Sequence, residues 1–375
     1  MDLFPERELE TIRVVALSRY GRLGASSRLR MMQFAPALKA AGVELAVLPF
    51  FDDLYLQKTY AGESKRAQSV LAFLRRFRTS KALRDSDLIW VEKEALPWLP
   101  WIIENAVLPS HVPIVSDYDD AIFHNYDIHP SSVVRRLMGA KIDRVMARSS
   151  LVAAGNRYLA DRAEKAGAST VEIVPTVVDT TVYSTRTENS EAKMSVSVGW
   201  IGTPSTWAAY MEPMMPMLQE SIARVSSRLR VVGAGEAASR HPNVDNLAWS
   251  EEEEVSEIQK MAIGIMPLTD TPWARGKCGY KLIQYMACGL PVIASPVGVN
   301  SEIVEHGVNG FLASNEVEWR QALDVLLTDP GLRARMGAAG RKKVEDQYSL
   351  QVWGPRVAQM LRDVAVTHSK KRRGD

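Results

Sequence analysis

The residues best suited to chemistry form a loop rich in glycine and lysine near position 280. Gly276-Lys277-Cys278-Gly279 comes directly before Tyr280–Ala287, whose apolar residues have helical spacing and which includes Lys281. Backbone N–H groups at the start of a helix bind anions, and the two lysines add positive charge. The pattern indicates a site for the diphosphate of a nucleotide. The alternative is an ordinary glycine-rich turn, which occurs throughout α/β proteins.

A second group consists of three carboxylates within four residues, at Asp117, Asp119 and Asp120. Carboxylates this close repel one another and need a cationic partner, a metal ion or wide exposure. Oxygen ligands at this spacing suit Mg²⁺. His124 follows as a separate candidate for a catalytic role, and the alternative for the carboxylates is capping of the next helix.

A third loop follows the first strand-like segment. It contains Gly21, Gly24, Ser26 and Arg28. The glycines allow a tight turn, and Ser26 or Ser27 is expected to cap the following helix. The loop lacks the G-x-G-x-x-G pattern, so it does not favour a dinucleotide. Arg28 and Arg30 are expected either to meet a charged ligand or to face solvent.

The elements that must position these loops alternate between strand-like and helical segments, the pattern of doubly wound parallel sheets. The predicted strands are Ile12–Leu17, Glu44–Phe50, Leu88–Val91, Ile114–Ser116, Leu151–Ala154, Glu172–Val174, Ser195–Ile201, Arg230–Val232, Ile263–Met266, Val292–Ala294 and Gly310–Leu312. Helices are expected at Ser27–Ala41, Tyr158–Ala166 and Val352–Val366. Ligands of such sheets bind at the carboxyl ends of the strands, where these loops lie.

The length of 375 residues suits two domains, and a polar stretch at 178–192 is the best candidate for the connection between them. We predict an N-terminal Rossmann-like domain at 1–178, a linker at 179–194, a C-terminal Rossmann-like domain at 195–349, and a final helix with a basic tail at 350–375. The hydrophobic fraction of 46% and the charged fraction of 24% are those of a globular protein.

Composition also limits the compartment and the partners. No apolar run reaches the roughly 20 residues of a membrane helix, and acidic residues near the start argue against a cleaved signal peptide. The two cysteines, Cys278 and Cys288, indicate no disulfide framework and are expected to be small packing residues. A net charge of +2 does not favour nucleic acid. We therefore expect a cytoplasmic protein with no nucleic-acid partner.

One segment is locally basic and amphipathic. Lys65–Arg84 holds seven basic residues and no acidic ones, with apolar residues at near-helical spacing between them. A basic amphipathic helix with aromatic residues can lie on an anionic membrane surface. Val133–Arg148 repeats the pattern. The alternative is that both segments are solvated outer faces of helices.

Several linked motifs extend the signature around residue 280. They are Gly199-Trp-Ile-Gly-Thr-Pro204, Val231-Val-Gly-Ala-Gly-Glu236, Trp249-Ser-Glu-Glu-Glu-Glu254, Ile265-Met-Pro-Leu268 and Val297-Gly-Val-Asn-Ser-Glu302. In order and spacing they resemble the donor-binding half of the bacterial group-1 (family 4-like) retaining glycosyltransferases. That family has the GT-B fold, in which two Rossmann-like domains face a cleft.

The resemblance implies a nucleoside diphosphate sugar as donor and a glycan or lipid-linked acceptor, with neither a metal nor another cofactor. The donor-binding residues would be Gly202, Gly235, Glu236, Lys277, Cys278, Gly279, Tyr280, Lys281 and Gln284. The catalytic candidates are Asp119, Asp120 and His124, and the loop with Gly21, Gly24, Ser26 and Arg28 would touch acceptor or phosphate. It also implies a role in surface polysaccharide or glycolipid assembly, peripheral on the inner face of the plasma membrane.

The chain departs from the family pattern at two places. Many relatives carry two glutamates eight positions apart, where this chain has Gly276 and Gln284. Many also place an arginine and a lysine after the first strand of the C-terminal domain, where this chain has neither. We expect Lys277 and Lys281 to supply that charge. The alternatives are a catalytically degenerate nucleotide-binding or scaffold subunit, a sugar-nucleotide epimerase, or a phosphorylase with pyridoxal phosphate.

Overall fold

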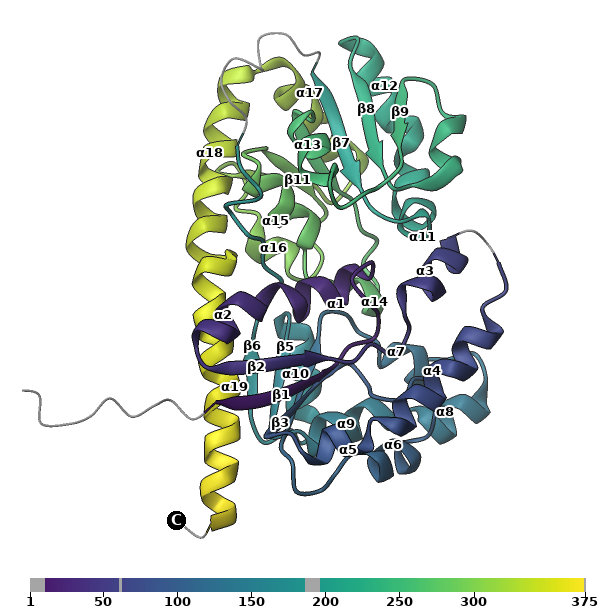
Figure 1. Cartoon of the computed structure of the whole chain (residues 1–375). Helices are drawn as coiled ribbons and strands as arrows, with labels where there is room; N and C mark the ends of the chain where they lie inside the picture. The colour runs from purple at the N-terminus through teal and green to yellow at the C-terminus, as the bar shows by residue number, and fades with distance from the viewer. Residues whose placement is uncertain (1–10, 61–62, 186–195, 374–375) are drawn as a thin grey trace, which may run out of the picture. The chain divides into compact units, whose positions relative to one another are not determined.

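The computed structural model describes residues 11–60, 63–185 and 196–373 of the chain, which form two compact units. Unit 1 comprises Met1–Pro175 together with Trp353–Asp375, and unit 2 comprises Thr176–Val352. Each unit holds a six-stranded sheet whose paired strands are all parallel, with helices around it (Figure 1). The prediction of two Rossmann-like, doubly wound domains is confirmed.

The sheet of unit 1 has the strand order β2-β1-β3-β4-β5-β6. Its strands are β1 (Ile12–Leu17), β2 (Val43–Val47), β3 (Leu88–Glu92), β4 (Ile114–Tyr118), β5 (Leu151–Ala154) and β6 (Val171–Ile173). The chain moves from β1 to β2 on one side and then to β3 on the other side of β1. The strand order therefore reverses between β1 and β3, the point where open α/β sheets bind ligands.

Helices surround this sheet, and the central strands β3 and β4 are buried along their whole length. The helices of unit 1 are α1 (Ala25–Arg30), α2 (Ala35–Ala40), α3 (Asp53–Tyr60), α4 (Arg66–Arg78), α5 (Ser80–Arg84), α6 (Trp101–Val107), α7 (His124–Asp127), α8 (Ser132–Met138), α9 (Lys141–Arg148) and α10 (Arg157–Lys165). The last helix, α19 (Leu350–Arg373), starts in unit 2 and continues into unit 1. There it donates a hydrogen bond from Arg362 to the carbonyl of Ala41 over 2.7 Å.

The predicted continuous helix at Ser27–Ala41 is wrong. Helix α1 ends at Arg30, a 3₁₀ turn follows at Met32–Phe34, and α2 begins at Ala35. Pro36 lies in the first turn of α2, where a proline is tolerated. Within one long helix its ring would clash with the carbonyl of residue 32, and its missing N–H would break the ladder of hydrogen bonds.

The sheet of unit 2 has the strand order β12-β11-β10-β7-β8-β9. Its strands are β7 (Ser197–Ile201), β8 (Arg228–Val232), β9 (Val244–Leu247), β10 (Ile263–Met266), β11 (Val292–Ala294) and β12 (Gly310–Leu312). Here the order reverses between β7 and β10. The sequence did not predict β9, because its Val-Asp-Asn-Leu run has little β propensity and lies half-buried at the sheet edge.

The helices of unit 2 complete its layers. They are α11 (Pro204–Thr206), α12 (Met215–Arg224), α13 (Glu254–Gln259), α14 (Pro272–Arg275), α15 (Tyr280–Ala287), α16 (Asn300–Ile303), α17 (Glu316–Thr328) and α18 (Pro330–Gln347). Part of the predicted linker belongs to this unit. Val178 is buried and pairs with Ser349, and Arg341 donates hydrogen bonds to the carbonyls of Thr180 and Tyr183. The rest of the linker, at 186–195, lies outside the described residues.

Candidate functional site

In unit 2, Gly202 and Lys281 meet where the strand order reverses. Gly202 follows β7, and Lys281 lies in the first turn of α15. A Cβ atom on Gly202 would stand 2.7 Å from the Lys281 Nζ and 2.6 Å from ring carbons of Trp200. Only glycine leaves space for the lysine there, so the structure brings these two predicted donor residues together.

The ammonium group of Lys281 lies against an aromatic ring and has a lowered pKa. Its Nζ lies 4.4 Å from the centroid of the Trp200 ring, a cation–π contact. Burial, together with the nearby charge of Lys277, lowers the pKa of Lys281 to about 7. Within the described residues Lys281 forms no ion pair with a carboxylate. An anionic ligand would therefore meet a lysine whose charge is not already neutralised.

The neighbouring residues of α15 shape this corner. Gly279 caps α15 with a φ of 65°, and a Cβ there would stand 2.3 Å from Ile303. The Lys277 Nζ lies 5.8 Å from the centroid of the Tyr210 ring. Cys278 is buried, as is Cys288, in agreement with the packing role expected for both.

The loop after β8 lies beside the loop after β7. Gly235 has a φ of 68°, and a Cβ there would stand 3.2 Å from Pro204. Its carbonyl accepts a hydrogen bond from the Asn246 side chain over 2.8 Å. Glu236 follows and is exposed. Gly202 and Gly235 are thus on adjacent loops, since β7 and β8 are paired strands.

Gln284 lies in a buried polar network. Its amide nitrogen donates to Glu254 over 2.9 Å and to the hydroxyl of Tyr183 over 3.1 Å. The hydroxyls of Tyr183 and Tyr280 are 3.1 Å apart. Sequence reasoning found Tyr280 and Gln284 but missed Tyr183, because its segment was interpreted as a polar linker.

In unit 1, the carboxylates of Asp119 and Asp120 share one cation, Lys93. The Lys93 Nζ lies 2.8 Å from Asp119 Oδ1 and 2.9 Å from Asp120 Oδ2. Ser26 donates to Asp119 Oδ2 over 2.6 Å. These residues follow β1, β3 and β4, so the predicted loop and the predicted carboxylates come together where the strand order of unit 1 reverses.

Sequence reasoning missed Lys93, which follows β3 as Asp119 follows β4. Lys93 is buried and has a φ of 65°, a strained backbone conformation for a residue with a side chain. Burial alone would raise the pKa of Asp119, but the charge of Lys93 and hydrogen bonds from Lys93 and Ser26 hold that pKa below its usual value. Among the described residues no group of three or more His, Cys, Asp or Glu is arranged to hold a metal ion.

Two expectations about the first loop are wrong. Of the two alternatives for Arg28 and Arg30, the one in which they face solvent is wrong: both are buried, Arg28 donates to the carbonyl of Arg22, and Arg30 forms a two-point ion pair with Asp117. Burial raises the pKa of Asp117 to about 6 despite this partner. Neither Ser26 nor Ser27 caps α1, whose cap residue is Gly24.

The remaining predicted residues of unit 1 have structural contacts. Gly21 donates its N–H to the carbonyl of Phe51 over 3.1 Å, and a Cβ there would stand 2.4 Å from Asp53. His124 has both ring nitrogens engaged, with Asp127 over 2.8 Å and with the hydroxyl of Tyr158 over 2.9 Å. The hydrogen bonds of His124 therefore join it to another residue of α7 and to a residue of α10.

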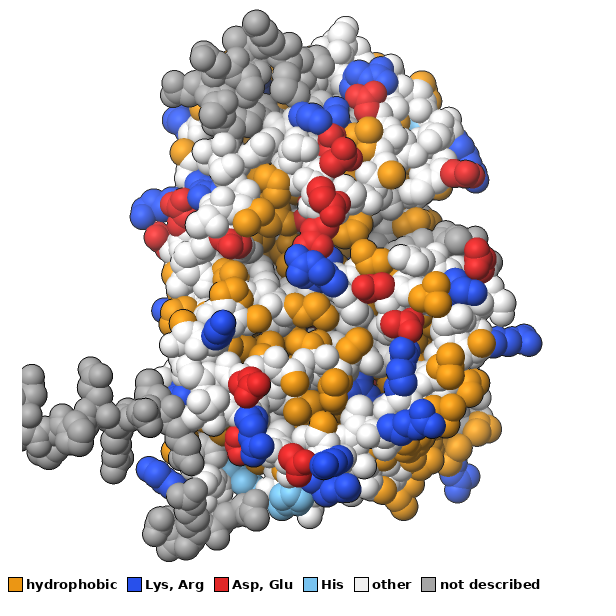
Figure 2. Space-filling view, viewed as in Figure 1, with side chains coloured by type: hydrophobic (Ala, Val, Ile, Leu, Met, Phe, Trp, Pro, Cys, Tyr) orange, Lys and Arg blue, Asp and Glu red, His pale blue; other side chains and the backbone are white. Residues whose placement is uncertain are grey.

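Helix α4 carries apolar residues on its outer side. Its exposed apolar side chains are Val70 (61% exposed), Leu71 (54%), Leu74 (48%) and Phe77 (43%). Arg76, in contrast, points inward and donates to the carbonyl of Ser18 over 3.1 Å. Figure 2 shows hydrophobic side chains, with lysine and arginine around them, over the part of unit 1 where Figure 1 labels α4 and α8. No helix in the described parts of the chain is both long and apolar enough to span a bilayer.

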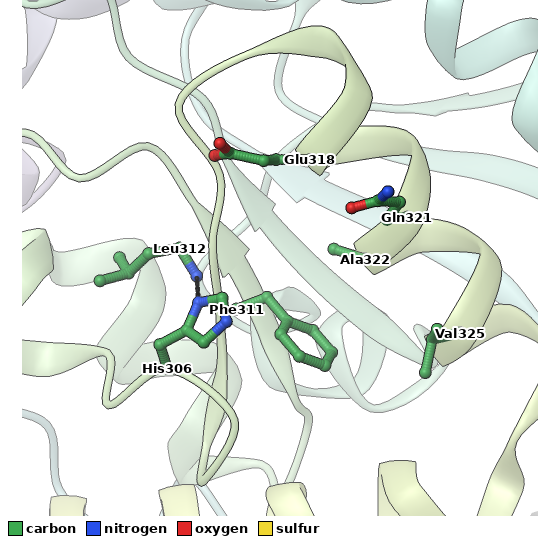
Figure 3. Close-up of a pocket in the computed structure, with 7 residues that line it drawn as sticks. All are labelled: His306, Phe311, Leu312, Glu318, Gln321, Ala322 and Val325. Carbon is green, nitrogen blue, oxygen red and sulfur yellow. Dashed lines mark hydrogen bonds between the residues drawn. The ribbon is translucent and has the colours of Figure 1, made fainter.

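A shallow groove of about 370 Å³ lies beside β12, an edge strand of the sheet of unit 2 (Figure 3). His306 and Phe311 line it from the side of β12, and Glu318 and Val325 from α17. The N–H of Leu312 donates to the His306 ring over 3.1 Å. The residues predicted from the sequence do not line this groove.

Residues 196–329 match the model of a family described as glycosyl transferases group 1. The chain therefore carries a group 1 glycosyltransferase domain. Over 84 residues it is 37% identical to the GDP-mannose-dependent monoacylated alpha-(1-6)-phosphatidylinositol monomannoside mannosyltransferase of Corynebacterium glutamicum, a match covering 22% of each chain. Over 67 residues it is 39% identical to the human alpha-1,3/1,6-mannosyltransferase ALG2, covering 18% of this chain and 16% of that protein. The matches thus span about a fifth of these curated relatives.

Solved structures resemble nearly the whole chain. The sucrose-phosphate synthase of Thermosynechococcus elongatus matches with a TM-score of 0.71 at 14% identity, covering 95% of this chain and 100% of that one. HepE of Anabaena, in complex with UDP and glucose, matches with a TM-score of 0.69 at 17% identity, covering 94% and 100%. This likeness shows the fold, the two Rossmann-like domains of GT-B glycosyltransferases.

Proposed function

We propose that the protein is a retaining glycosyltransferase that moves a hexose from a nucleoside diphosphate sugar to an acceptor hydroxyl. The observation that carries the proposal is the meeting of Lys281 and Gly202 between β7 and β10, inside the matched family domain. A lysine that has no carboxylate partner in the described part of the chain, beside the N-terminus of α15, suits the diphosphate of a donor.

The chemistry follows from what the leaving group needs. The bond between the anomeric carbon and the β-phosphate oxygen breaks, and that oxygen gains negative charge. Lys277, Lys281 and the N–H groups at the start of α15 would stabilise this charge. The acceptor oxygen forms the new bond on the same face of the sugar, and its proton passes to the departing diphosphate. No protein nucleophile is then required.

Other donor contacts come from the adjacent loops. Gly235 and Glu236 would lie near the nucleotide base, and Gln284 near the ribose, with Cys278, Gly279 and Tyr280 completing the site. Support comes from relatives: the corynebacterial mannosyltransferase is named for GDP-mannose, and the HepE structures hold UDP, glucose or UDP-glucose.

The acceptor would be bound by unit 1. The Lys93–Asp119–Asp120 cluster offers carboxylate oxygens that can accept hydrogen bonds from sugar hydroxyls, and Ser26 links it to the loop that holds Gly21, Gly24 and Arg28. Asp119 and Asp120 would contact the reacting groups. His124 stays a candidate, with the weaker case because both of its ring nitrogens are engaged.

A lipid-linked acceptor on an anionic membrane is the partner that fits α4. Its outward apolar side chains are 43% to 61% exposed, and the arginines of the same helix suit anionic headgroups. We therefore propose that the protein acts at the inner face of the plasma membrane, in surface polysaccharide or glycolipid assembly. We propose that the domain predicted at 1–178 binds the acceptor and the domain predicted at 195–349 binds the donor, with the segment at 179–194 connecting them in the chain and a final helix at 350–375.

The test is a thermal unfolding screen of the purified protein against UDP, GDP, ADP, CDP, dTDP and their common sugars. A ligand at 100 times its dissociation constant should add about 2.7 kcal/mol of stability. A selective shift, followed by nucleoside diphosphate release with acceptor present, supports the proposal. NMR of the product then reads the anomeric configuration. Binding without turnover would favour a degenerate scaffold subunit, and no shift with any nucleotide would refute the proposal.

A further inference from the structure

The polar network around Gln284 is centred on one carboxylate, that of Glu254. Glu254 begins α13 and is buried. Its Oε1 accepts hydrogen bonds from Gln284 and from the hydroxyl of Tyr183, and its Oε2 accepts one from the indole N–H of Trp249 over 2.5 Å. Three hydrogen-bond donors thus converge on the Glu254 carboxylate.

This carboxylate fixes the orientation of the Gln284 amide. Glu254 Oε1, which also accepts from the Tyr183 hydroxyl, lies 2.9 Å from Gln284, so the group of Gln284 that faces it is the donor, the amide nitrogen. The amide oxygen of Gln284 is then left to accept a hydrogen bond from another group. Within the described residues, no N–H or O–H group donates to that oxygen.

We propose that Glu254 is a positioning residue of the donor site: it holds the nitrogen of Gln284 and leaves the amide oxygen to accept a hydrogen bond from a ribose hydroxyl. This inference rests on the proposed function, since it needs a nucleotide in unit 2. It also accounts for the departure at position 284. Gln284 presents an oxygen acceptor as a glutamate would, without the charge.

The identity of residue 284 follows from the same contact. A glutamate at 284 would put two carboxylates about 2.9 Å apart in a buried site, where both cannot stay ionised. Glutamine avoids this repulsion because it adds a donor toward Glu254. Gln284 is therefore the partner that Glu254 requires, and the absence of a glutamate at 284 does not indicate lost binding.

The experiment compares UDP and GDP with their 2′,3′-dideoxy forms by calorimetric titration. In the wild type, the ribonucleotide that binds should bind about 10-fold more tightly than its dideoxy form, the effect of one hydrogen bond. Glu254→Gln and Gln284→Leu should both bring this ratio close to one and leave the dideoxy affinity little changed. A residue that only stabilises the fold would weaken both forms equally.

The double variant Glu254→Gln/Gln284→Glu provides the rescue, because it exchanges the two groups and keeps one carboxylate. It should restore the ratio and the thermal stability that Gln284→Glu alone loses. A wild-type ratio in Glu254→Gln, or no rescue of stability in the double variant, would overturn the inference. If no nucleoside diphosphate of the thermal screen binds the wild type, the proposed function and the ribose contact both fail, whereas rescued stability would still identify the Glu254–Gln284 pair.

Discussion

Raising the pH above 7 should weaken the binding of a nucleoside diphosphate sugar, because Lys281 must then take up a proton to meet the diphosphate. Burial and Lys277 lower the pKa of Lys281 to about 7 in the free protein. Below that pH the lysine is already charged, and ligand binding needs no proton. Above it, the charged fraction falls tenfold for each pH unit.

The size of the effect follows from that pKa. Between about pH 6.5 and about pH 8.5 the charged fraction of a group with this pKa falls roughly 25-fold. The dissociation constant should rise by about the same factor, provided that the bound diphosphate keeps Lys281 charged. UDP-glucose is the suitable probe, because its diphosphate has no free terminal phosphate that would titrate in this range.

Calorimetry in buffers of different ionisation enthalpy measures both the affinity and the proton uptake. The control is Lys281→Arg, since a guanidinium stays charged throughout and should flatten the profile. Lys281→Met should bind weakly at every pH. A flat wild-type profile, or the same slope in Lys281→Arg, would refute the assignment of Lys281 to the diphosphate.

Three further predictions concern packing, charge and surface. Gly202→Ala should reduce the free energy of unfolding by about 1–3 kcal/mol in denaturant and weaken donor binding, because the new Cβ would lie 2.6 Å from the buried Trp200 ring. The control Gly331→Ala, whose Cβ would have no contact closer than 3.3 Å, should change neither property. Lys93→Met should cost about 1–3 kcal/mol, because Asp119 and Asp120 lose the cation they share, and Asp120→Asn should restore part of that loss. Equal stability of wild type and Lys93→Met would contradict a stabilising ion pair. The double variant Leu71→Glu/Leu74→Glu should no longer float with anionic vesicles, whereas Val317→Glu, which changes a comparably exposed residue of unit 2, should still float. If the wild type does not float with these vesicles, the membrane proposal is refuted.

The sequence was informative where one local pattern determines the outcome. The apolar runs of the central strands predicted β1, β3, β4, β7 and β10, and the rule that ligands bind at their carboxyl ends located both clusters. The break of the helix at 27–41 could have been found from Pro36 alone, because a proline restricts the turn before it.

What the sequence could not supply were partners brought together by the fold. Lys93 lies 26 and 27 positions from the carboxylates it neutralises, and Glu254 lies 30 positions from Gln284. Tyr183 was missed because a buried tyrosine in a polar segment has no periodic neighbours to identify it. A signal for Lys93 did exist: it directly follows a buried strand, as Asp119 does.

The most direct test of the diphosphate site compares UDP with uridine in calorimetric titrations of the wild type and Lys277→Met/Lys281→Met. Lys342→Met, an exposed lysine of α18, is the matched control. The double variant should bind UDP about 100-fold more weakly and uridine with unchanged affinity, since two charge-assisted contacts are lost from the phosphates alone. Unchanged UDP binding, or equal weakening of UDP and uridine, would contradict the assignment of this site to the donor diphosphate.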